Sequence, residues 1–289
     1  MSLSRRQLLH SSAWFGAGYA LSPSLDFWAD FKRRFHIGAC DWSLGKSANI
    51  EAFALAKNIG LQGIQVNLGN LANDLHLRKA EVQAQYLAAS KNTGVKISSL
   101  AISELNNVPY KSDPRTEQWV SDSIDVARAF GVKVVLLAFF VKNDLRNDPA
   151  GIAEVIQRLK KVAPKAERAG VTLGIESYLT AEEHLHIMRE VGSPAIKVFY
   201  DFRNAADAGN DIYQELKTLG KTNICELHMK ENRLLLDKGT IDWPRVATAL
   251  REIGYRGDHW MQIEWAKPDG DDVVTAYQHN LAYLKGLFQ

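Results

Sequence analysis

The sequence is poor in cysteine and has almost no net charge, and each deficit excludes a class of protein. Cys40 and Cys225 are the only cysteines. Two cysteines cannot build a disulfide scaffold in a domain of this size, and neither belongs to a CxxC pattern. Both lie in apolar segments, so we expect buried free thiols. The net charge is only +2, so we expect no nucleic-acid partner, which would require a basic surface.

A hydrophobic run long enough to span a bilayer is also missing. Residues 1–29 instead combine Arg5 and Arg6, a short apolar stretch rich in Gly and Ser, and a polar break, which is the layout of an export signal. The paired arginines resemble a twin-arginine signal. We expect export to the periplasm, with cleavage between Ala20 and Ala29 or retention as an uncleaved anchor. An amphipathic N-terminal helix that stays with the protein is the alternative.

From residue 35 onward, short apolar runs alternate with longer amphipathic segments. Eight runs are continuous in hydrophobicity and rich in β-branched or aromatic residues, as strands buried on both faces are: 35–42, 63–68, 96–102, 133–140, 171–177, 197–202, 223–229 and 260–265. Five of the intervening segments have a helical pattern and end at a glycine, which adopts the left-handed conformation at a helix end without strain: 50–59, 78–93, 116–130, 149–169 and 242–253.

Eight strands alternating with eight helices predict an α/β fold, a single (β/α)₈ TIM barrel, over residues 34–289. The competing architecture is a doubly wound open sheet, which would carry a Gly-rich phosphate-binding turn after its first strand. Residues 39–47 have no such turn. The longest irregular segment, 103–115, is expected to cover the active-site end of the barrel.

The last four predicted strands each end with a side chain that can bind a metal. In a barrel of this kind, residues at the C-terminal strand ends point into the active-site mouth. Three carboxylates and one imidazole form a hard site, mostly of oxygen ligands. We therefore predict one divalent ion, Mn²⁺ first, with Mg²⁺, Co²⁺ or Zn²⁺ as alternatives, bound by Glu176, Asp201, His228 and Glu264.

The sequence around these residues resembles a known family. The segments GIES, VFYDFRNA, ELHMKE, KGTIDWPRVATALREIGYRG and QIEW are similar to those of the xylose-isomerase-like barrels of the sugar isomerase/epimerase superfamily. In its ketose 3-epimerases the four matching positions bind one divalent ion, and the two glutamates also act as acid and base. The resemblance therefore implies catalytic roles for Glu176 and Glu264, with Asp201 and His228 as ligands only.

The chemistry of such a site is consistent with proton transfer next to a carbonyl. A divalent ion stabilises the developing enediolate as a Lewis acid, and two carboxylates can remove and return the proton. The sequence departs from the epimerase pattern where sugar is recognised: Asn204 replaces a histidine, and Leu234 replaces an arginine, with Arg233 adjacent. Together with other polar or aromatic residues near the strand ends, the candidate substrate-binding residues are Lys230, Trp42, Asn67, Asn204, Trp265, Glu182 and Arg233.

We therefore expect a metal-dependent isomerase or epimerase of an unphosphorylated sugar or sugar derivative, because no segment resembles a phosphate cradle. A lyase or hydrolase of 3-keto-glycosides, using the same ion and base, is one alternative. An exported sugar-binding protein without activity is another. A DNA-repair nuclease of related fold would need more histidines at the strand ends and a basic surface. The partner is a small carbohydrate, and the sequence leaves a homo-oligomer open.

Overall fold

The computed structural model describes residues 35–256 and 259–289, so the predicted export segment, residues 1–29, lies outside the described residues. Within the described ranges, no helix is both long and apolar enough to cross a bilayer.

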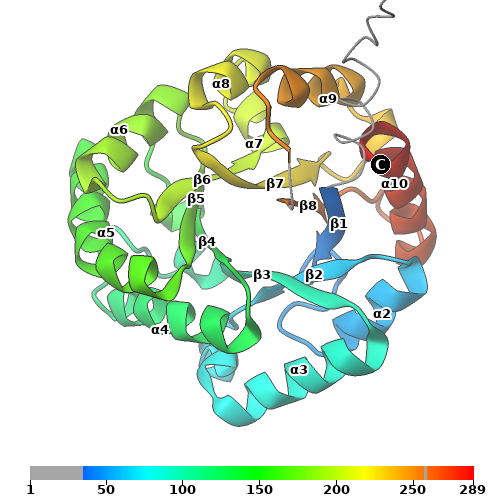
Figure 1. The fold of residues 1–289 in the computed structure, drawn as a ribbon, viewed down its shortest axis with the longest axis horizontal. Helices are drawn as coiled ribbons and strands as arrows, with labels where there is room; N and C mark the ends of the chain where they lie inside the picture. The colour runs from blue at the N-terminus through cyan, green and yellow to red at the C-terminus, as the bar shows by residue number, and fades with distance from the viewer. Residues whose placement is uncertain (1–34, 257–258) are drawn as a thin grey trace, which may run out of the picture.

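Eight parallel strands form a closed barrel in the order of the chain, with β1 paired to β8 (Figure 1). The predicted (β/α)₈ barrel is confirmed, and the strand bounds fall within two residues of those expected at nearly every end. The strands are β1 (Phe35–Cys40), β2 (Gly63–Asn67), β3 (Lys96–Ile102), β4 (Val134–Phe139), β5 (Thr172–Ser177), β6 (Ile196–Asp201), β7 (Ile224–Lys230) and β8 (His259–Glu264).

Helices surround the barrel in a ring (Figure 1). They are α2 (Glu51–Ile59), α3 (Ala80–Thr93), α4 (Arg115–Phe130), α5 (Pro149–Ala169), α6 (Ala181–Val191), α7 (Phe202–Asp207), α8 (Ile212–Leu219), α9 (Trp243–Glu252) and α10 (Val273–Phe288). Short 3₁₀ turns lie at Leu71–Asn73, His76–Arg78, Ser103–Asn106, Val141–Asn143 and Leu236–Lys238.

The segment between β6 and β7 holds two helices where one was expected. The Asp201 carboxylate caps α7 by accepting a hydrogen bond from the Asn204 backbone N–H, and Asp211 caps α8 in the same manner. Between them, Gly209 adopts a φ of 86°, which interrupts the helix. Two separate caps therefore divide this connection, and the first of them is one of the predicted metal ligands.

Four of the five predicted glycine stops are confirmed as left-handed C-caps: Gly60, Gly94, Gly131 and Gly170. The fifth helix, α9, has Ile253 as its C-cap residue, and Gly254 follows with a φ of 70°. These turns return the chain to the N-terminal end of the next strand.

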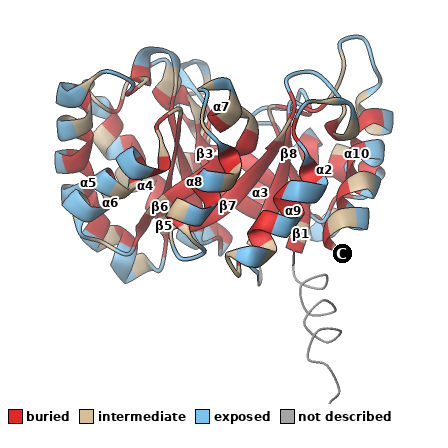
Figure 2. Ribbon diagram, turned by 90° about the horizontal axis from the view of Figure 1, so that it is seen from above, coloured by how far each residue is buried: buried red, intermediate tan, exposed pale blue. Residues whose placement is uncertain are grey.

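Alternate residues of the strands serve two separate apolar cores. On β4, Val135, Leu137 and Phe139 belong to the main core, which lies between strands and helices, where Figure 2 shows buried surfaces facing each other. Leu136 and Ala138 belong to a smaller cluster that includes Phe199. The period of two residues thus leaves one side chain in two pointing into the barrel, where the polar groups also lie.

Candidate metal centre

Four strands deliver the four predicted ligands to one point at the C-terminal end of the barrel. Asp201 and Glu264 are the last residues of β6 and β8, Glu176 is the penultimate residue of β5, and His228 lies two residues before the end of β7. All four are buried, and each offers a ligand atom that lies within 4.8 Å of those of the other three. The residues predicted to converge are therefore brought together.

The imidazole of His228 is oriented by the barrel interior. Its Nε2 lies 2.8 Å from Oε1 of Gln65, an oxygen that only accepts hydrogen bonds, so the hydrogen belongs on Nε2. Its Nδ1 faces the carboxylates, at 2.8 Å from Oε1 of Glu176 and 3.7 Å from oxygens of Asp201 and Glu264. A partner on the second ring nitrogen is how metal-binding histidines are usually fixed, which makes Nδ1 the ligand atom.

Two carboxylate oxygens at this point lack hydrogen-bond donors. Oδ2 of Asp201 and Oε2 of Glu264 are buried and accept no hydrogen bond of ordinary geometry from the described residues. The Lys230 ammonium approaches them at 3.5 Å and 3.1 Å, but it is a single charge beside three buried acids. Buried oxygens left without partners are costly. The set fits a divalent cation, with three oxygens and one imidazole nitrogen as hard ligands.

Burial and charge move the pKa values of the carboxylates in opposite directions. Burial raises the pKa of Glu176 to about 7, although the nearby His228 favours its charged form. Burial also acts against the Asp201 carboxylate, but Lys230 and His228 outweigh it and lower its pKa to about 2. A pair of acids with separated pKa values suits different roles: Asp201 stays ionised as a ligand, and Glu176 can hold or release a proton near neutral pH.

Three predicted substrate-binding residues also contact the ligands. Trp42 donates a hydrogen bond from Nε1 to Oε1 of Glu264 at 2.7 Å. Asn204 places Nδ2 3.4 Å from Oε1 of Glu176 and accepts at Oδ1 from Nζ of Lys230 at 3.0 Å. The Trp42 contact leaves Oε2 of Glu264 facing the cluster, and the Asn204 contact holds Oε1 of Glu176, the oxygen that lies next to Nδ1 of His228. The three side chains therefore position the ligands as well as border the cavity.

A cavity of about 420 Å³ borders the cluster, and two of the four ligands, Glu176 and Glu264, line it. Five of the seven predicted substrate-binding residues line it: Trp42, Asn67, Asn204, Lys230 and Trp265. The structure does not bring the other two to it. Glu182 is exposed in the first turn of α6, and the Arg233 guanidinium is 69% exposed and paired with Asp269 at 2.8 Å. The loop after β3, expected to cover the site, contributes Ser103, Asn106 and Asn107.

The sequence analysis missed Gln65, Phe140 and Tyr178. Gln65 is fully buried on β2, and the signal for it was a polar residue inside an apolar run, two positions before Asn67 and hence on the same face. Phe140 and Tyr178 follow β4 and β5 and stack edge to face with ring centroids 4.8 Å apart. An aromatic residue directly after each of two adjacent strands was their signal.

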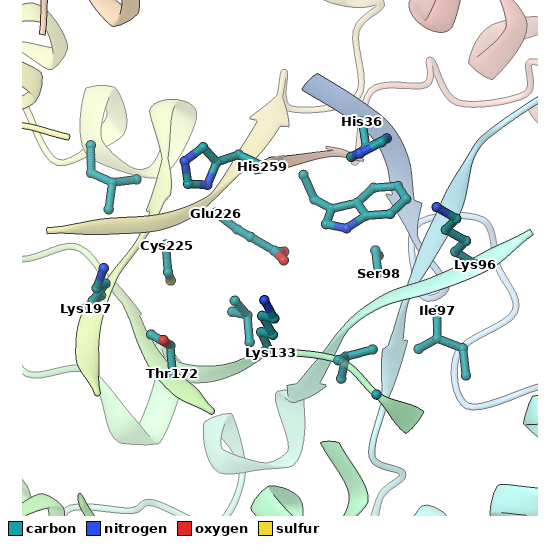
Figure 3. Close-up of a pocket in the computed structure, with 15 residues that line it drawn as sticks. His36, Lys96, Ile97, Ser98, Lys133, Thr172, Lys197, Cys225, Glu226 and His259 are labelled. Carbon is teal, nitrogen blue, oxygen red and sulfur yellow. The ribbon is translucent and has the colours of Figure 1, made fainter. Parts of the chain in front are cut away.

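A second cavity, of about 450 Å³, lies at the N-terminal end of the barrel, among the first residues of the strands (Figure 3). The Glu226 carboxylate points toward its centre, and Lys96, Lys133 and Lys197 lie around it. Residues 35–256 and 259–289 contain groups of three or more acidic, His or Cys side chains that could share one ion. All such groups within these ranges lie at the C-terminal end and are formed by Cys40 and the four ligands. The second cavity therefore has no comparable ligand set.

A closed barrel with a buried acid and imidazole cluster at its C-terminal end defines a class of proteins with one metal centre among the strand ends. Residues 53–287 match the family described as xylose isomerase-like TIM barrel. The chain belongs to that family, as the resemblance predicted.

Individual relatives are sugar epimerases. A 2-epi-5-epi-valiolone 7-phosphate 2-epimerase from Actinoplanes sp. is 26% identical over 253 residues, which make up 80% of this chain and 93% of that protein. The structure of D-psicose 3-epimerase with D-tagatose, from Clostridium cellulolyticum H10, has a TM-score of 0.74 and 17% identity, covering 87% of this chain and 99% of that one. A 3-keto-D-glucoside 4-epimerase from E. coli has a TM-score of 0.70 and 15% identity, covering 88% and 100%. The two structural likenesses describe the fold.

Proposed function

We propose that this protein is a metal-dependent isomerase or epimerase of an unphosphorylated sugar or sugar derivative. The observation that carries the proposal is the convergence of Glu176, Asp201, His228 and Glu264 in one buried cluster below a cavity. The epimerase activities of the relatives support the reaction class. We propose Mn²⁺ as the ion, since a site of three carboxylates and one imidazole suits it.

The two glutamates carry the proton transfer. When bound, a divalent ion supplies Lewis acidity toward adjacent oxygens of the substrate. Glu176 and Glu264 come from β5 and β8, so their carboxylates approach the cavity from different parts of the ring. One takes a proton from the carbon next to a carbonyl, and the other returns a proton to the substrate. Burial raises the pKa of Glu176 to about 7, and a divalent ion bound beside it would lower that pKa and favour the carboxylate form that accepts a proton.

The lining of the cavity favours a neutral substrate. Among the described residues that line it, Lys230 is the one basic side chain, and its ammonium lies within 3.5 Å of both Asp201 and Glu264. A dianionic phosphate would need further donors, such as backbone N–H groups at a helix N-terminus or a second cation. The Actinoplanes relative is named for a 7-phosphate, so we expect the two proteins to differ in this part of the site.

Isotope exchange tests the proposal directly. The protein is loaded with Mn²⁺ and incubated in D₂O with free ketoses and with 3-keto-glucosides, and the products are followed by NMR. We expect deuterium on the carbon next to the carbonyl of an intact sugar, together with an epimer or isomer. Glu264→Gln should slow this exchange by about 10²- to 10⁴-fold. Failure of every sugar to exchange, with normal binding, would instead support a sugar-binding protein without activity.

A 3-keto-glycoside lyase is the second candidate, because the cavity continues beyond the polar residues to an apolar rim at Val141 and Trp265. In that reaction one glutamate removes the proton at C2, the electron pair forms the C1–C2 double bond, the C1–O bond breaks, and the other glutamate donates a proton to the oxygen of the departing aglycone. The same NMR experiment separates the two reactions, since elimination gives a free aglycone and epimerisation does not.

We also infer that the protein is exported to the periplasm by the twin-arginine route, on the strength of Arg5 and Arg6 in the sequence. A folded passenger can load its metal before export. Changing both arginines to lysine and fractionating the cells tests this. We expect the variant to remain in the cytoplasm, and equal periplasmic amounts of both forms would rule out the route.

A further inference from the structure

Two residues at the mouth of the site have unusual backbone conformations and carry exposed apolar side chains. Val141 has a φ of 55° and is 74% exposed; Trp265 has a φ of 46° and is 44% exposed. Both line the cavity over the metal centre. The left-handed region is strained for a β-branched or bulky residue, and Asn or Gly would adopt it more easily. Such strain, retained next to a site, suggests a function for the side chain.

The loops hold both residues firmly. After β4, the Asn143 side chain donates to the carbonyl of Ala138 at 2.8 Å, and Asn106 accepts from the Phe140 N–H at 3.0 Å. After β8, the carbonyl of Trp265 accepts from the Arg233 N–H at 2.9 Å, and the carbonyl of Ala266 accepts from the Asn280 side chain. The exposure of Val141 and Trp265 is therefore fixed by buried hydrogen bonds on both sides of the mouth.

On the β4 side of the mouth, apolar side chains extend into the cavity. Phe140 precedes Val141 and packs edge to face on Tyr178, and Leu136 and Ala138 also line the cavity. Hydroxyl and amide groups share the lining and come from Ser47, Asn67, Ser103, Asn106, Asn107 and Asn204. The cavity thus offers hydrogen-bond partners to hydroxyl groups and, beside them, an aromatic and aliphatic wall that hydroxyl groups cannot use.

We propose that Phe140 and Val141, on the β4 side of the mouth, form a subsite for an apolar aglycone, so that the substrate is an aryl or alkyl glycoside derivative rather than a free sugar. This inference rests on the proposed function, because it places the sugar ring on the polar residues above the metal centre. A substituent on that ring then has to extend toward the mouth, where the apolar side chains lie. Two rigidly held apolar residues bury area on such a group at little cost in entropy.

The test compares two probes that differ only in the aglycone. Methyl β-D-glucoside and phenyl β-D-glucoside are titrated into the Mn²⁺-loaded protein by calorimetry. We expect the phenyl glucoside to bind about tenfold more tightly, which is ~1.4 kcal/mol. In Val141→Asn this ratio should fall several-fold, while the melting temperature stays equal or rises, because Asn suits the left-handed conformation. Leu87→Ser, at an exposed apolar position on α3, is the matched control and should leave the ratio unchanged.

Each outcome decides one point. Equal binding of the two glucosides, a ratio unaffected by Val141→Asn, or no binding of either probe at millimolar concentration overturns the subsite. Because the readout is binding, it is independent of turnover. A preference for the phenyl glucoside without isotope exchange on any sugar would keep the subsite and sink the proposed function. Isotope exchange on free ketoses, with no preference between the two glucosides, would support the proposed function and overturn the subsite.

Discussion

The two ends of the barrel hold cavities of similar size and opposite chemistry. The C-terminal cavity has a volume of about 420 Å³ and the N-terminal one about 450 Å³, yet among the residues that the structure describes a set of four ligand side chains meets only beside the first. At the N-terminal end the buried carboxylate, Glu226, accepts a hydrogen bond from the Ser99 hydroxyl at 2.8 Å, and burial raises its pKa to about 8. It is therefore mostly protonated at neutral pH and partnered. The C-terminal cavity therefore differs from the N-terminal one in the buried carboxylate oxygens without hydrogen-bond donors that meet beside it, and not in volume.

The largest expected effect is on the rate of isotope exchange. It comes from replacing an acidic residue at the C-terminal end of the barrel, whereas the same replacement at the N-terminal end should have little effect. Glu264→Gln and Glu176→Gln should each lower the rate of isotope exchange by about 10²- to 10⁴-fold at saturating Mn²⁺, because a positioned general acid or base contributes that much. Glu226→Gln is the matched control, since glutamine resembles the protonated acid already present there. Exchange rates measured by NMR on the three variants decide the matter. A Glu226→Gln protein as impaired as the other two would break the comparison.

The pH dependence of stability gives a second test of the C-terminal end of the barrel. His184 supports the C-terminal end through a bond between Nε2 and the hydroxyl of Ser177, 2.9 Å apart and next to Glu176. Burial lowers the pKa of His184 from 6.5 to about 4, so between these values the unfolded chain binds more protons than the folded one. The contribution of His184 to the free energy of unfolding should therefore fall by about 3 kcal/mol as the pH drops from 6.5 to 4, while the raised pKa values of Glu176 and Glu226 act in the opposite direction.

Chemical denaturation at several pH values measures this slope. His184→Gln should remove this contribution, so that the stability advantage of the wild type over the variant decreases as the pH drops through that window. His186→Gln, on the exposed side of the same helix, should leave the slope as in the wild type. An unchanged slope in His184→Gln would contradict the assignment.

A smaller effect is expected from the residue that orients the histidine ligand. Gln65→Ala removes the acceptor for Nε2–H of His228 and should weaken Mn²⁺ binding by about 10- to 100-fold. The control is a second buried glutamine of the barrel interior: Gln262 donates to Ser98 at 2.9 Å, and Ser98 lines the N-terminal cavity. Gln262→Met should leave the Mn²⁺ affinity unchanged in a calorimetric titration. Equal losses in both variants would show that general disturbance of the interior, not the imidazole contact, sets the affinity.

Much of the fold could be predicted from the sequence because its signals are local. Glycines such as Gly131 and Gly170 end helices through their own φ angles, and the apolar runs match strands. The four ligands were predictable since each lies at the end of a strand or within two residues of it, and strand ends meet in a barrel. Gln65 was missed because the inward face of β2 depends on the register with β3, which shifts between Ile64 and Gln65. Glu182 lies away from the site because Thr180 begins α6 with a capping box, which turns the chain before Glu182 can reach the cavity.

Metal binding tests the central claim most directly. Equilibrium dialysis of the wild type and of an Asp201→Asn, His228→Gln double variant against Mn²⁺, followed by metal analysis, gives the number of ions per chain. We predict one ion per chain for the wild type and none at the same concentration for the variant. A wild type that binds no ion, or a variant that binds as well as the wild type, would contradict the assignment of Glu176, Asp201, His228 and Glu264 as a metal centre.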